Sequence, residues 1–351
     1  MKRLALLVLC INILGCGSAG FLYPTQYGPN EYGYINKKGQ MVLSGYRSVG
    51  EFRSGLALVR INDDAVYVNE HGKIVIEERH NWIFYDDFAD GLARVLVSLD
   101  DAADFDAADF GAAVFKVGFM NTDGDMVISP QYDRYIGEDS GIGTFSDGLC
   151  VFAKEVSDGG EEIVLYGYID KKGECIIDPK YKKAGDFSCG LAPVLTDDDW
   201  SIIDTNGATV AKGYVPIYGY RDGYCLARTD KNQNVLLDRM GERHAYEYEI
   251  WQYSEGLIPA RKDNKWGYID IDGNVVIPFK YEMALPFHEG HAIVVLGGIS
   301  GFIKKDGSVL FMSPSYEAHS GFSDGVGVVK GEDGLYYINE DGLIIGKVYL
   351  R

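Results

Sequence analysis

Short apolar runs alternate with polar turns from residue 21 to the end of the chain. The pattern is clearest in residues 265–295, where Asp270 and Gly273 take the first and fourth positions of one turn. β-Branched and aromatic residues favour strands, and Asp and Gly at these two positions favour a tight hairpin. No window of helical length interrupts the segment. It therefore predicts four short strands, at 266–270, 275–278, 284–287 and 292–296.

A hairpin glycine recurs along the chain at a nearly fixed interval. It follows an Asp, Asn or Lys by three residues at nine places: Gly39, Gly72, Gly124, Gly173, Gly207, Gly241, Gly273, Gly307 and Gly342. Six of the eight intervals are 32–35 residues long, and the two longer ones contain insertions. A second landmark, an aromatic residue three positions before a glycine, has the same period: Phe52, Phe88, Phe145, Phe187, Tyr220, Tyr253, Phe287 and Phe322. A period between 20 and 50 residues is typical of solenoids, propellers and arrays.

The repeat predicts an all-β fold in one domain, residues 21–351, with about nine units of four short strands each. We favour a propeller or propeller-like closed ring, because closure protects strand edges. An open β-solenoid is the alternative, since nine blades exceed the usual four to eight. The chain begins and ends part-way through a unit. A closed ring is therefore expected to pair the strand near 21–24 with the terminal hairpin near 335–350.

The unit resembles a known repeat. Residues 265–270 are KWGYID, 276–278 are VIP and 287–295 are FHEGHAIVV. These segments are similar to the WG repeat, also called the KWG repeat, of bacterial proteins. Only Trp266-Gly267 has the naming dipeptide, whereas other units have drifted pairs such as Tyr32-Gly33 and Tyr166-Gly167. The resemblance covers nearly all of 21–351 and implies the fold. It implies no single activity, because the family is defined by its repeat.

The first 15 residues have the pattern of a secretion signal. Lys2 and Arg3 precede an apolar stretch, 4–14, that is too short to span a bilayer. Residues 13–16, Ile-Leu-Gly-Cys, resemble a bacterial lipobox. This pattern predicts cleavage before Cys16 and lipidation of its thiol.

Residues 16–20 are then expected to be a short tether between the lipid and the repeat domain. The predicted location is the bacterial cell envelope, with the lipid as the only membrane attachment. In a Gram-negative host we expect the outer membrane, because Gly17 rather than Asp follows the cysteine. Small residues at 17–19 leave ordinary cleavage after Ala19, and hence secretion, as the alternative.

The chain is strongly acidic, with 52 Asp and Glu against 33 Lys and Arg and a formal net charge of -19. Loss of Lys2 and Arg3 with the signal makes the mature chain more acidic still. Such a surface repels nucleic acid, so no nucleic-acid partner is predicted. Neutral, cationic or metal-bridged partners remain.

Candidate chemistry is sparse. The insertion at 96–116 has a tandem Asp-Ala-Ala-Asp-Phe but lacks the Ca²⁺-loop pattern, so we predict a solvated acidic loop and no metal site. His288 and His291 occupy a turn and are expected to be solvent-exposed rather than metal ligands. No metalloprotease, P-loop or nucleophile-elbow motif is present, and no cofactor is predicted.

Cysteines and tyrosines fit packing better than chemistry. Cys150 and Cys225 take a position that other units fill with alanine, which predicts core packing. A disulfide among these two, Cys175 and Cys189 is the alternative in an oxidising compartment. A tyrosine ends the second hairpin strand in five units, where packing between units is expected and sugar stacking is the alternative: Tyr46, Tyr132, Tyr181, Tyr281 and Tyr316.

These observations favour a lipid-anchored envelope scaffold that presents repeat loops to a protein or glycan partner. The alternative is an envelope enzyme that acts on a glycan with loop carboxylates, such as Asp197, Asp198 and Asp199 beside Trp200. The only site residue predicted is Cys16, for lipidation.

Overall fold

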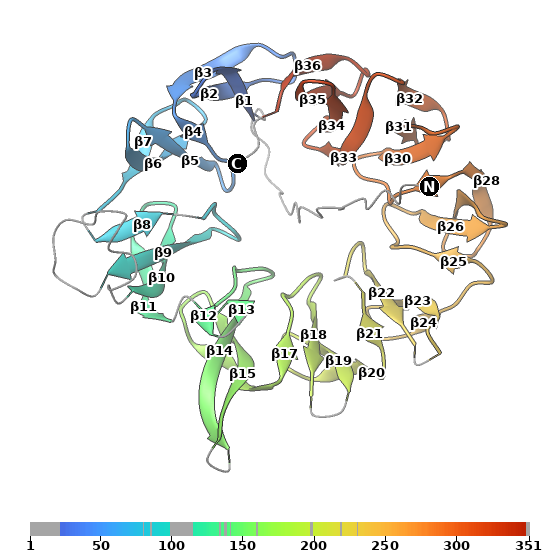
Figure 1. The fold of residues 1–351 in the computed structure, drawn as a ribbon. Helices are drawn as coiled ribbons and strands as arrows, with labels where there is room; N and C mark the ends of the chain where they lie inside the picture. Colours follow the sequence, from blue (N-terminus) through green and yellow to red (C-terminus); the bar gives the residue numbers. More distant parts are fainter. Residues whose placement is uncertain are drawn as a thin grey trace.

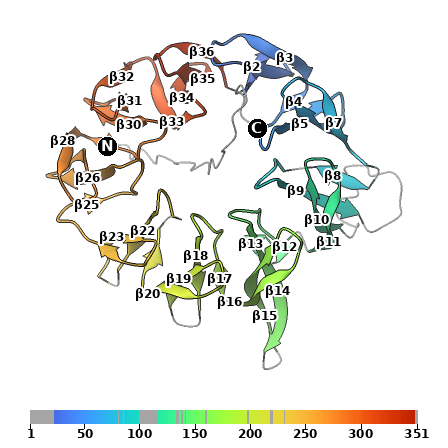
Figure 2. The same cartoon turned by 180° about the vertical axis from the view of Figure 1, so that it is seen from behind.

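A computed structural model describes residues 22–79, 81–84, 86–98, 115–132, 135–136, 139–140, 142–158, 161–196, 199–217, 220–229 and 231–348. These residues form strands and turns, with no helix among them. Figure 1 shows the strands grouped into blades that follow one another around a central opening, and Figure 2 shows the same ring from behind. The protein is an all-β propeller of nine blades, as predicted, and the open solenoid is excluded.

The strands form antiparallel blades, which we number in chain order. Blades 1 to 3 comprise β1 (Tyr23–Gly28), β2 (Glu31–Ile35) and β3 (Met41–Tyr46); β4 (Ser48–Val49), β5 (Leu56–Ile61), β6 (Asp64–Asn69) and β7 (Ile74–Glu77); and β8 (Trp82–Phe84), β9 (Leu92–Ser98), β10 (Phe115–Asn121) and β11 (Met126–Tyr132). Blade 4 has a separate pair, β12 (Tyr135–Ile136) and β13 (Asp139–Ser140), beside β14 (Leu149–Asp158), β15 (Glu161–Asp170) and β16 (Cys175–Tyr181). Blades 5 and 6 comprise β17 (Lys183–Ala184), β18 (Leu191–Leu195), β19 (Trp200–Asp204) and β20 (Thr209–Lys212); and β21 (Val215–Pro216), β22 (Tyr224–Arg228), β23 (Asn234–Asp238) and β24 (Arg243–His244). Blades 7 to 9 comprise β25 (Glu249–Ile250), β26 (Ile258–Lys262), β27 (Lys265–Ile269) and β28 (Val275–Tyr281); β29 (Met283–Ala284), β30 (His291–Leu296), β31 (Ile299–Lys304) and β32 (Val309–Met312); and β33 (Glu317–Ser323), β34 (Val326–Gly331), β35 (Gly334–Asn339) and β36 (Ile344–Lys347).

Three of the four strands predicted in 265–295 match β27, β28 and β30. The third predicted strand, 284–287, is mostly not a strand, because β29 ends at Ala284. The backbone then leaves the ladder, and the ring of Phe287 packs against Tyr268 of the preceding blade with ring centroids 4.8 Å apart. Burial of this aromatic side chain, rather than strand pairing, determines the local conformation.

The two glycine landmarks are both turns with positive φ. At the first, the N–H of Gly273 (φ +89°) donates to the carbonyl of Asp270 at 3.1 Å. The Asp270 carboxylate also accepts the backbone N–H groups of Asp272 and Asn274 at 3.0 and 2.8 Å. At the second, Glu289 and Gly290 both have positive φ, at 48° and 78°, which is the backbone of a two-residue type I′ hairpin. The turn chemistry predicted from the repeat is confirmed.

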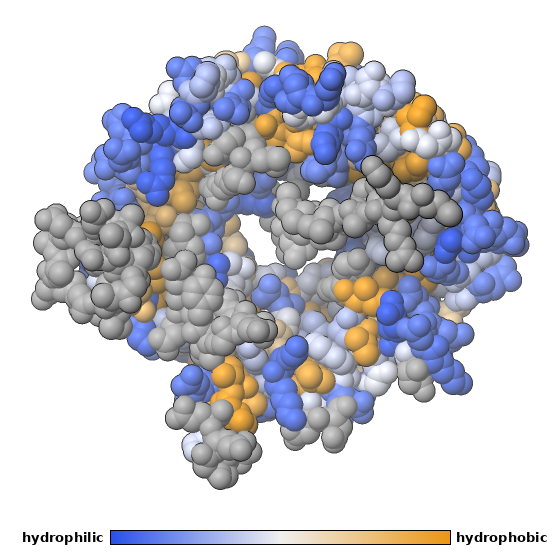
Figure 3. All heavy atoms as spheres, viewed as in Figure 1, coloured by the Kyte–Doolittle hydropathy of each residue, from blue (hydrophilic) through white to orange (hydrophobic). Residues whose placement is uncertain are grey.

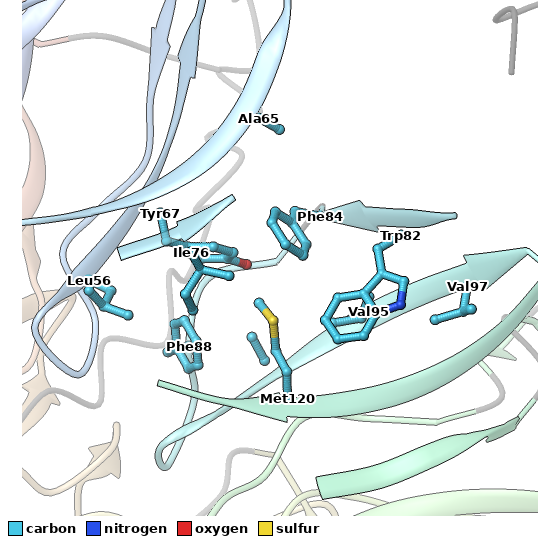
Figure 4. Close-up of a cluster of buried hydrophobic side chains, with 11 residues drawn as sticks. Leu56, Ala65, Tyr67, Ile76, Trp82, Phe84, Phe88, Val95, Val97 and Met120 are labelled. Atoms are coloured by element: carbon cyan, nitrogen blue, oxygen red, sulfur yellow. The ribbon is translucent and has the colours of Figure 1, made fainter. Parts of the chain in front are cut away.

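The core lies between blades rather than within them. Figure 4 shows one such cluster, in which Tyr67 and Ile76 of blade 2 face Phe84, Phe88 and Met120 of blade 3. Each side chain is nearly inaccessible to solvent. Because no blade buries its apolar face alone, stability depends on every blade having a neighbour on each side.

A hydrogen bond recurs at these junctions. The hydroxyl of Tyr268 donates to the carbonyl of Leu285 in the next blade at 2.8 Å, and Tyr34 and Tyr168 make the same bond to Gly50 and Gly185. In blade 9 the corresponding residue is Tyr337, whose hydroxyl donates to the carbonyl of Pro24 in blade 1 at 3.0 Å. The contact that joins successive blades therefore also closes the ring.

Two further contacts support closure. The hydroxyl of Thr25 donates to the carbonyl of Lys347 at 2.6 Å. Gly39 lies against the backbone carbonyl of Ile345, as Gly342 lies against that of Leu310 at the junction of blades 8 and 9. However, the predicted pairing of the first strand with the terminal hairpin is wrong, because among the described residues no ladder joins β1 to β36. The two terminal blades instead pack face to face, like all the others.

Candidate interaction surfaces

A ring of two-residue turns projects toward the central opening (Figure 1). We call these turns the inner rim: Ser54-Gly55, Asp90-Gly91, Asp147-Gly148, Cys189-Gly190, Asp222-Gly223, Glu255-Gly256, Glu289-Gly290 and Asp324-Gly325. Six of the eight carry a carboxylate in the first position. The sequence pattern alone does not show that these acids meet one another around a common axis.

The carboxylates link successive turns. Glu255 accepts the N–H groups of Glu289 and Gly290 at 2.5 and 2.9 Å, and Glu289 accepts those of Asp324 and Gly325 at 2.7 and 2.6 Å. Asp90, Asp147 and Asp222 bond the next turn in the same way. Charge-assisted bonds to backbone N–H groups are strong, so these carboxylates clamp blades together. Their oxygens are engaged in structure rather than presented to a ligand.

Glu255 shows how burial and neighbouring groups together determine the pKa of a clamp carboxylate. Burial acts to raise the pKa of Glu255. The N–H of Gly290 and the ammonium of Lys305, which lies 3.2 Å from the carboxylate, outweigh burial and hold the pKa below its usual value. The carboxylate is thus charged wherever the ring is folded near neutral pH.

Arg221 and His288 meet on the inner rim across an intervening blade. The two terminal guanidinium nitrogens lie 2.5 and 2.7 Å from Nε2 and Nδ1 of the imidazole. Burial and the Arg221 charge lower the pKa of His288 to about 4. The imidazole is therefore neutral at pH 7. His288 is half-buried and His291 is buried, with its ring stacked on Phe322 at a centroid distance of 4.1 Å, so the expectation that both histidines are solvent-exposed is wrong.

We predict that His288 makes the protein acid-sensitive. Its pKa is lower in the folded chain than the ordinary value of 6.5, so the unfolded state takes up a proton first as the pH falls from about 6.5 to about 4. Stability should therefore drop across this window. His288→Gln, which keeps an acceptor for Arg221, should reduce the drop in urea midpoint between pH 7 and pH 5. An equal drop in both proteins would contradict the assignment.

A second surface lies on the outer circumference. Each blade ends in an outermost strand that is hydrogen-bonded on one side only. In seven consecutive blades, from blade 7 through blade 9 to blade 4, exposed aliphatic side chains lie on this strand or immediately before it. We call them the outer belt: Val275, Val276, Val309, Leu343, Ile344, Met41, Val42, Ile74, Val75, Val127 and Ile176. Figure 3 shows hydrophobic atoms recurring around the edge of the ring among hydrophilic ones.

The outer belt is not continuous around the ring. The outermost strand of blade 5, β20, holds Thr209 and Lys212 at its ends and has no exposed large hydrophobic residue. Val275 and Leu343, by contrast, are 48% and 60% exposed. The aliphatic residues after the hairpin glycine are visible in the sequence. The repeat alone does not show whether they face solvent or the next blade, so sequence analysis missed this surface.

The predicted lipidation site, most of the acidic insertion and part of the run of aspartates beside Trp200 are not described by the structure. Cys16, Asp197 and Asp198 lie outside the described residues, as do positions 99–114 of the acidic insertion. Asp199 is exposed beside Trp200, and its carbonyl accepts the N–H and hydroxyl of Thr196 at 3.2 and 3.0 Å.

The tyrosine and cysteine expectations are largely confirmed. Tyr46, Tyr181 and Tyr281 are buried and pack between blades, so they cannot stack on a sugar. Cys150 and Cys225 are core residues, and burial raises the pKa of both thiols. All four described cysteines are free thiols.

The described part of the chain contains no helix that is long and apolar enough to cross a bilayer. No group of three or more His, Cys, Asp or Glu side chains among the described residues is arranged to hold a metal ion.

Comparison with solved structures gives distant likenesses. BamB from Moraxella catarrhalis is 9% identical, with 94% of each chain covered and a TM-score of 0.39. A protein of unknown function from Bacteroides caccae is 11% identical, with 94% of each chain covered and a TM-score of 0.20. The V. cholerae biofilm matrix protein Bap1 is 12% identical over 94% of this chain and 61% of its own, with a TM-score of 0.17. No curated protein matches the chain.

The family comparison agrees with the repeat found in the sequence. Residues 32–63, 118–155, 166–200, 245–266 and 266–298 match the family model described as WG containing repeat. The strands in the matched segments belong to blades 1 to 5, 7 and 8. The resemblance stated from the sequence is confirmed: the chain carries the WG containing repeat in five segments across its propeller.

Proposed function

We propose that the protein is a lipid-anchored scaffold of the bacterial cell envelope that binds a protein partner on its outer belt. The observation that carries this proposal is the recurrence of exposed aliphatic side chains on the outermost strands of seven consecutive blades. Aliphatic surface exposed to water is unfavourable by about 25 cal/mol per Å², and its covering by a partner recovers this free energy.

The chemistry of the belt favours protein over glycan. Valine, leucine and isoleucine offer no hydrogen bonds to sugar hydroxyls, and the repeated tyrosines Tyr46, Tyr181 and Tyr281 are buried between blades. The inner-rim carboxylates are engaged by backbone N–H groups of neighbouring turns. A closed ring supports binding because a rigid surface loses little conformational entropy on association.

Site-specific photo-crosslinking in the native host tests the outer belt. A photoreactive residue at Val275 should form adducts with a defined partner protein. The same residue at Thr209, which occupies the equivalent position of blade 5 and is also exposed, should not. Equal adducts at both positions, or none at Val275, would contradict binding through the belt.

The lipid anchor is a separate prediction. Cys16→Ala should abolish labelling with a palmitate analogue and move the protein from the membrane pellet to the soluble fraction. Continued labelling of the variant would show that Cys16 is not the lipidated residue. A parent protein that is unlabelled and already soluble would favour cleavage after Ala19 instead.

A further inference from the structure

The hairpin of β14 and β15 differs from its counterparts in every other blade. Both strands have ten residues, whereas the two central strands of the other blades have five to seven. The register continues from Leu149↔Asp170 to Asp158↔Glu161 without a shift. Figures 1 and 2 show this hairpin extending past the other blades. We call residues 154–158 and 161–165 of this hairpin the arm.

The backbone of the arm has two open edges. The ladder between β15 and β16 ends at Tyr166↔Tyr181, so among the described residues 161–165 pair with β14 alone. On the other side, the last backbone contacts of β14 with a described segment other than β15 are at Val151 and Phe152. Within the described ranges, residues 154–158 have no further strand beside them. Unpaired strand edges are templates for another strand.

The aliphatic side chains of the arm lie outside the described apolar core. Val156, Ile163, Val164 and Leu165 are half-buried, and none of them belongs to a buried cluster of the described core. The register places Val156 opposite Ile163 and Lys154 opposite Leu165, so one face of the arm carries three aliphatic residues. Three adjacent aliphatic side chains on an open hairpin provide a surface for an added strand.

We propose that the arm binds an extended segment of a partner protein by β-strand addition, and that this segment alternates aliphatic and basic residues. The open edges require a strand, and the aliphatic face requires apolar side chains at every second position. The other positions of the partner segment are expected to be basic, because the sequence of 154–165 contains four acidic residues and one basic residue in a chain of net charge -19. A second copy of the chain would bring like charges together, which disfavours pairing of two arms.

This inference rests on the proposed function in one respect, namely that the ring binds protein. It concerns a different site from the outer belt, since none of the four aliphatic arm residues is part of the belt. Experiments can therefore contradict binding at one site without contradicting binding at the other.

The test uses detergent-solubilised full-length protein and synthetic peptides. The probe is an eight-residue peptide of alternating lysine and valine. The controls are the same peptide with N-methyl groups along one edge and a peptide of alternating glutamate and valine. The arm-excised variant replaces residues 155–164 with Asp-Asn, the two-residue turn that joins Lys262 to Lys265 in blade 7.

Fluorescence titration should show saturable binding of the lysine-valine peptide, weakened at least ten-fold in the arm-excised variant and by N-methylation. The glutamate-valine peptide should bind at least ten-fold more weakly. Val156→Lys with Ile163→Lys provides a full-length variant with the same expected loss, should the excised chain not fold. Equal binding to intact and variant proteins, or no binding to the intact protein, overturns the proposal. Adducts at Val275 that persist in the arm-excised variant would show that the belt functions without the arm.

Discussion

A chain that ends at Leu343 is expected to lose cooperative unfolding. This truncation removes β36, including Ile345, which packs with Tyr23, Ile35 and Tyr337 at the junction of blades 9 and 1. It also removes the carbonyl of Lys347 that accepts the Thr25 hydroxyl. Full burial of an aliphatic side chain contributes about 1.5–3 kcal/mol, a half-buried one such as Ile345 contributes less, and each hydrogen bond contributes about 1 kcal/mol. The truncation also exposes the faces of Tyr23 and Ile35 that β36 covers, so the total loss is a substantial fraction of the stability of a domain.

The thermal midpoint of the truncated chain should fall by about 5–10 °C, with a broader transition or aggregation. Excision of residues 155–164 is the matched control, because it removes a similar length of chain far from the junction and should leave the midpoint nearly unchanged. A truncated chain that melts sharply within a degree or two of the parent would show that β36 does not hold the ring closed.

Gly39→Ala is expected to be much more destabilising than Gly91→Ala. Both glycines have positive φ, +74° and +83°, so alanine costs about 1–2 kcal/mol at either place. At Gly39 a Cβ atom would also lie 2.3 Å from the carbonyl oxygen of Ile345, on the far side of the closure. A backbone atom cannot move aside cheaply, so overpacking should add about 1–3 kcal/mol. At Gly91 nothing lies within 4 Å.

Urea denaturation of the two variants measures this difference directly. The midpoint of Gly39→Ala should lie clearly below that of Gly91→Ala, with an unchanged slope if both states remain compact. Equal midpoints would mean that the Ile345 backbone does not cover Gly39. The contact that repeats at internal junctions would then be absent at the closure.

The regular features of the fold were predictable because they are local. Hairpin glycines with positive φ and their Asp or Asn partners are determined by three to five consecutive residues, as at Asp270. The sequence also shows that a change in one blade is matched by a change in the next. In blade 5, β19 carries Ile202 where most blades have an aromatic residue, and the next aromatic landmark is Tyr220 instead of phenylalanine. The hydroxyl of Tyr220 donates to the carbonyl of Asp238 at 3.0 Å.

The remaining features depend on contacts between distant residues. Arg221 meets His288 across an intervening blade, a separation that no turn motif encodes. The aliphatic residue Ile277 is buried against blade 8, while its neighbours Val275 and Val276 are exposed, because packing against the next blade and not local sequence determines which side chains are covered. Closure by packing rather than by strand pairing likewise depends on how many blades complete the circle.

The distance between blades 9 and 1 tests the closed nine-blade ring most directly. Lys38, His71 and Asp341 are exposed and occupy the same position in the hairpins of blades 1, 2 and 9. Spin labels are placed on two variants, Lys38→Cys with Asp341→Cys and Lys38→Cys with His71→Cys, each with Cys175 and Cys189 replaced by serine. A closed ring predicts the same narrow distance distribution for both pairs, because both span one blade junction. A longer or broader distribution for the pair across the termini, beside a narrow one for the internal pair, would contradict closure.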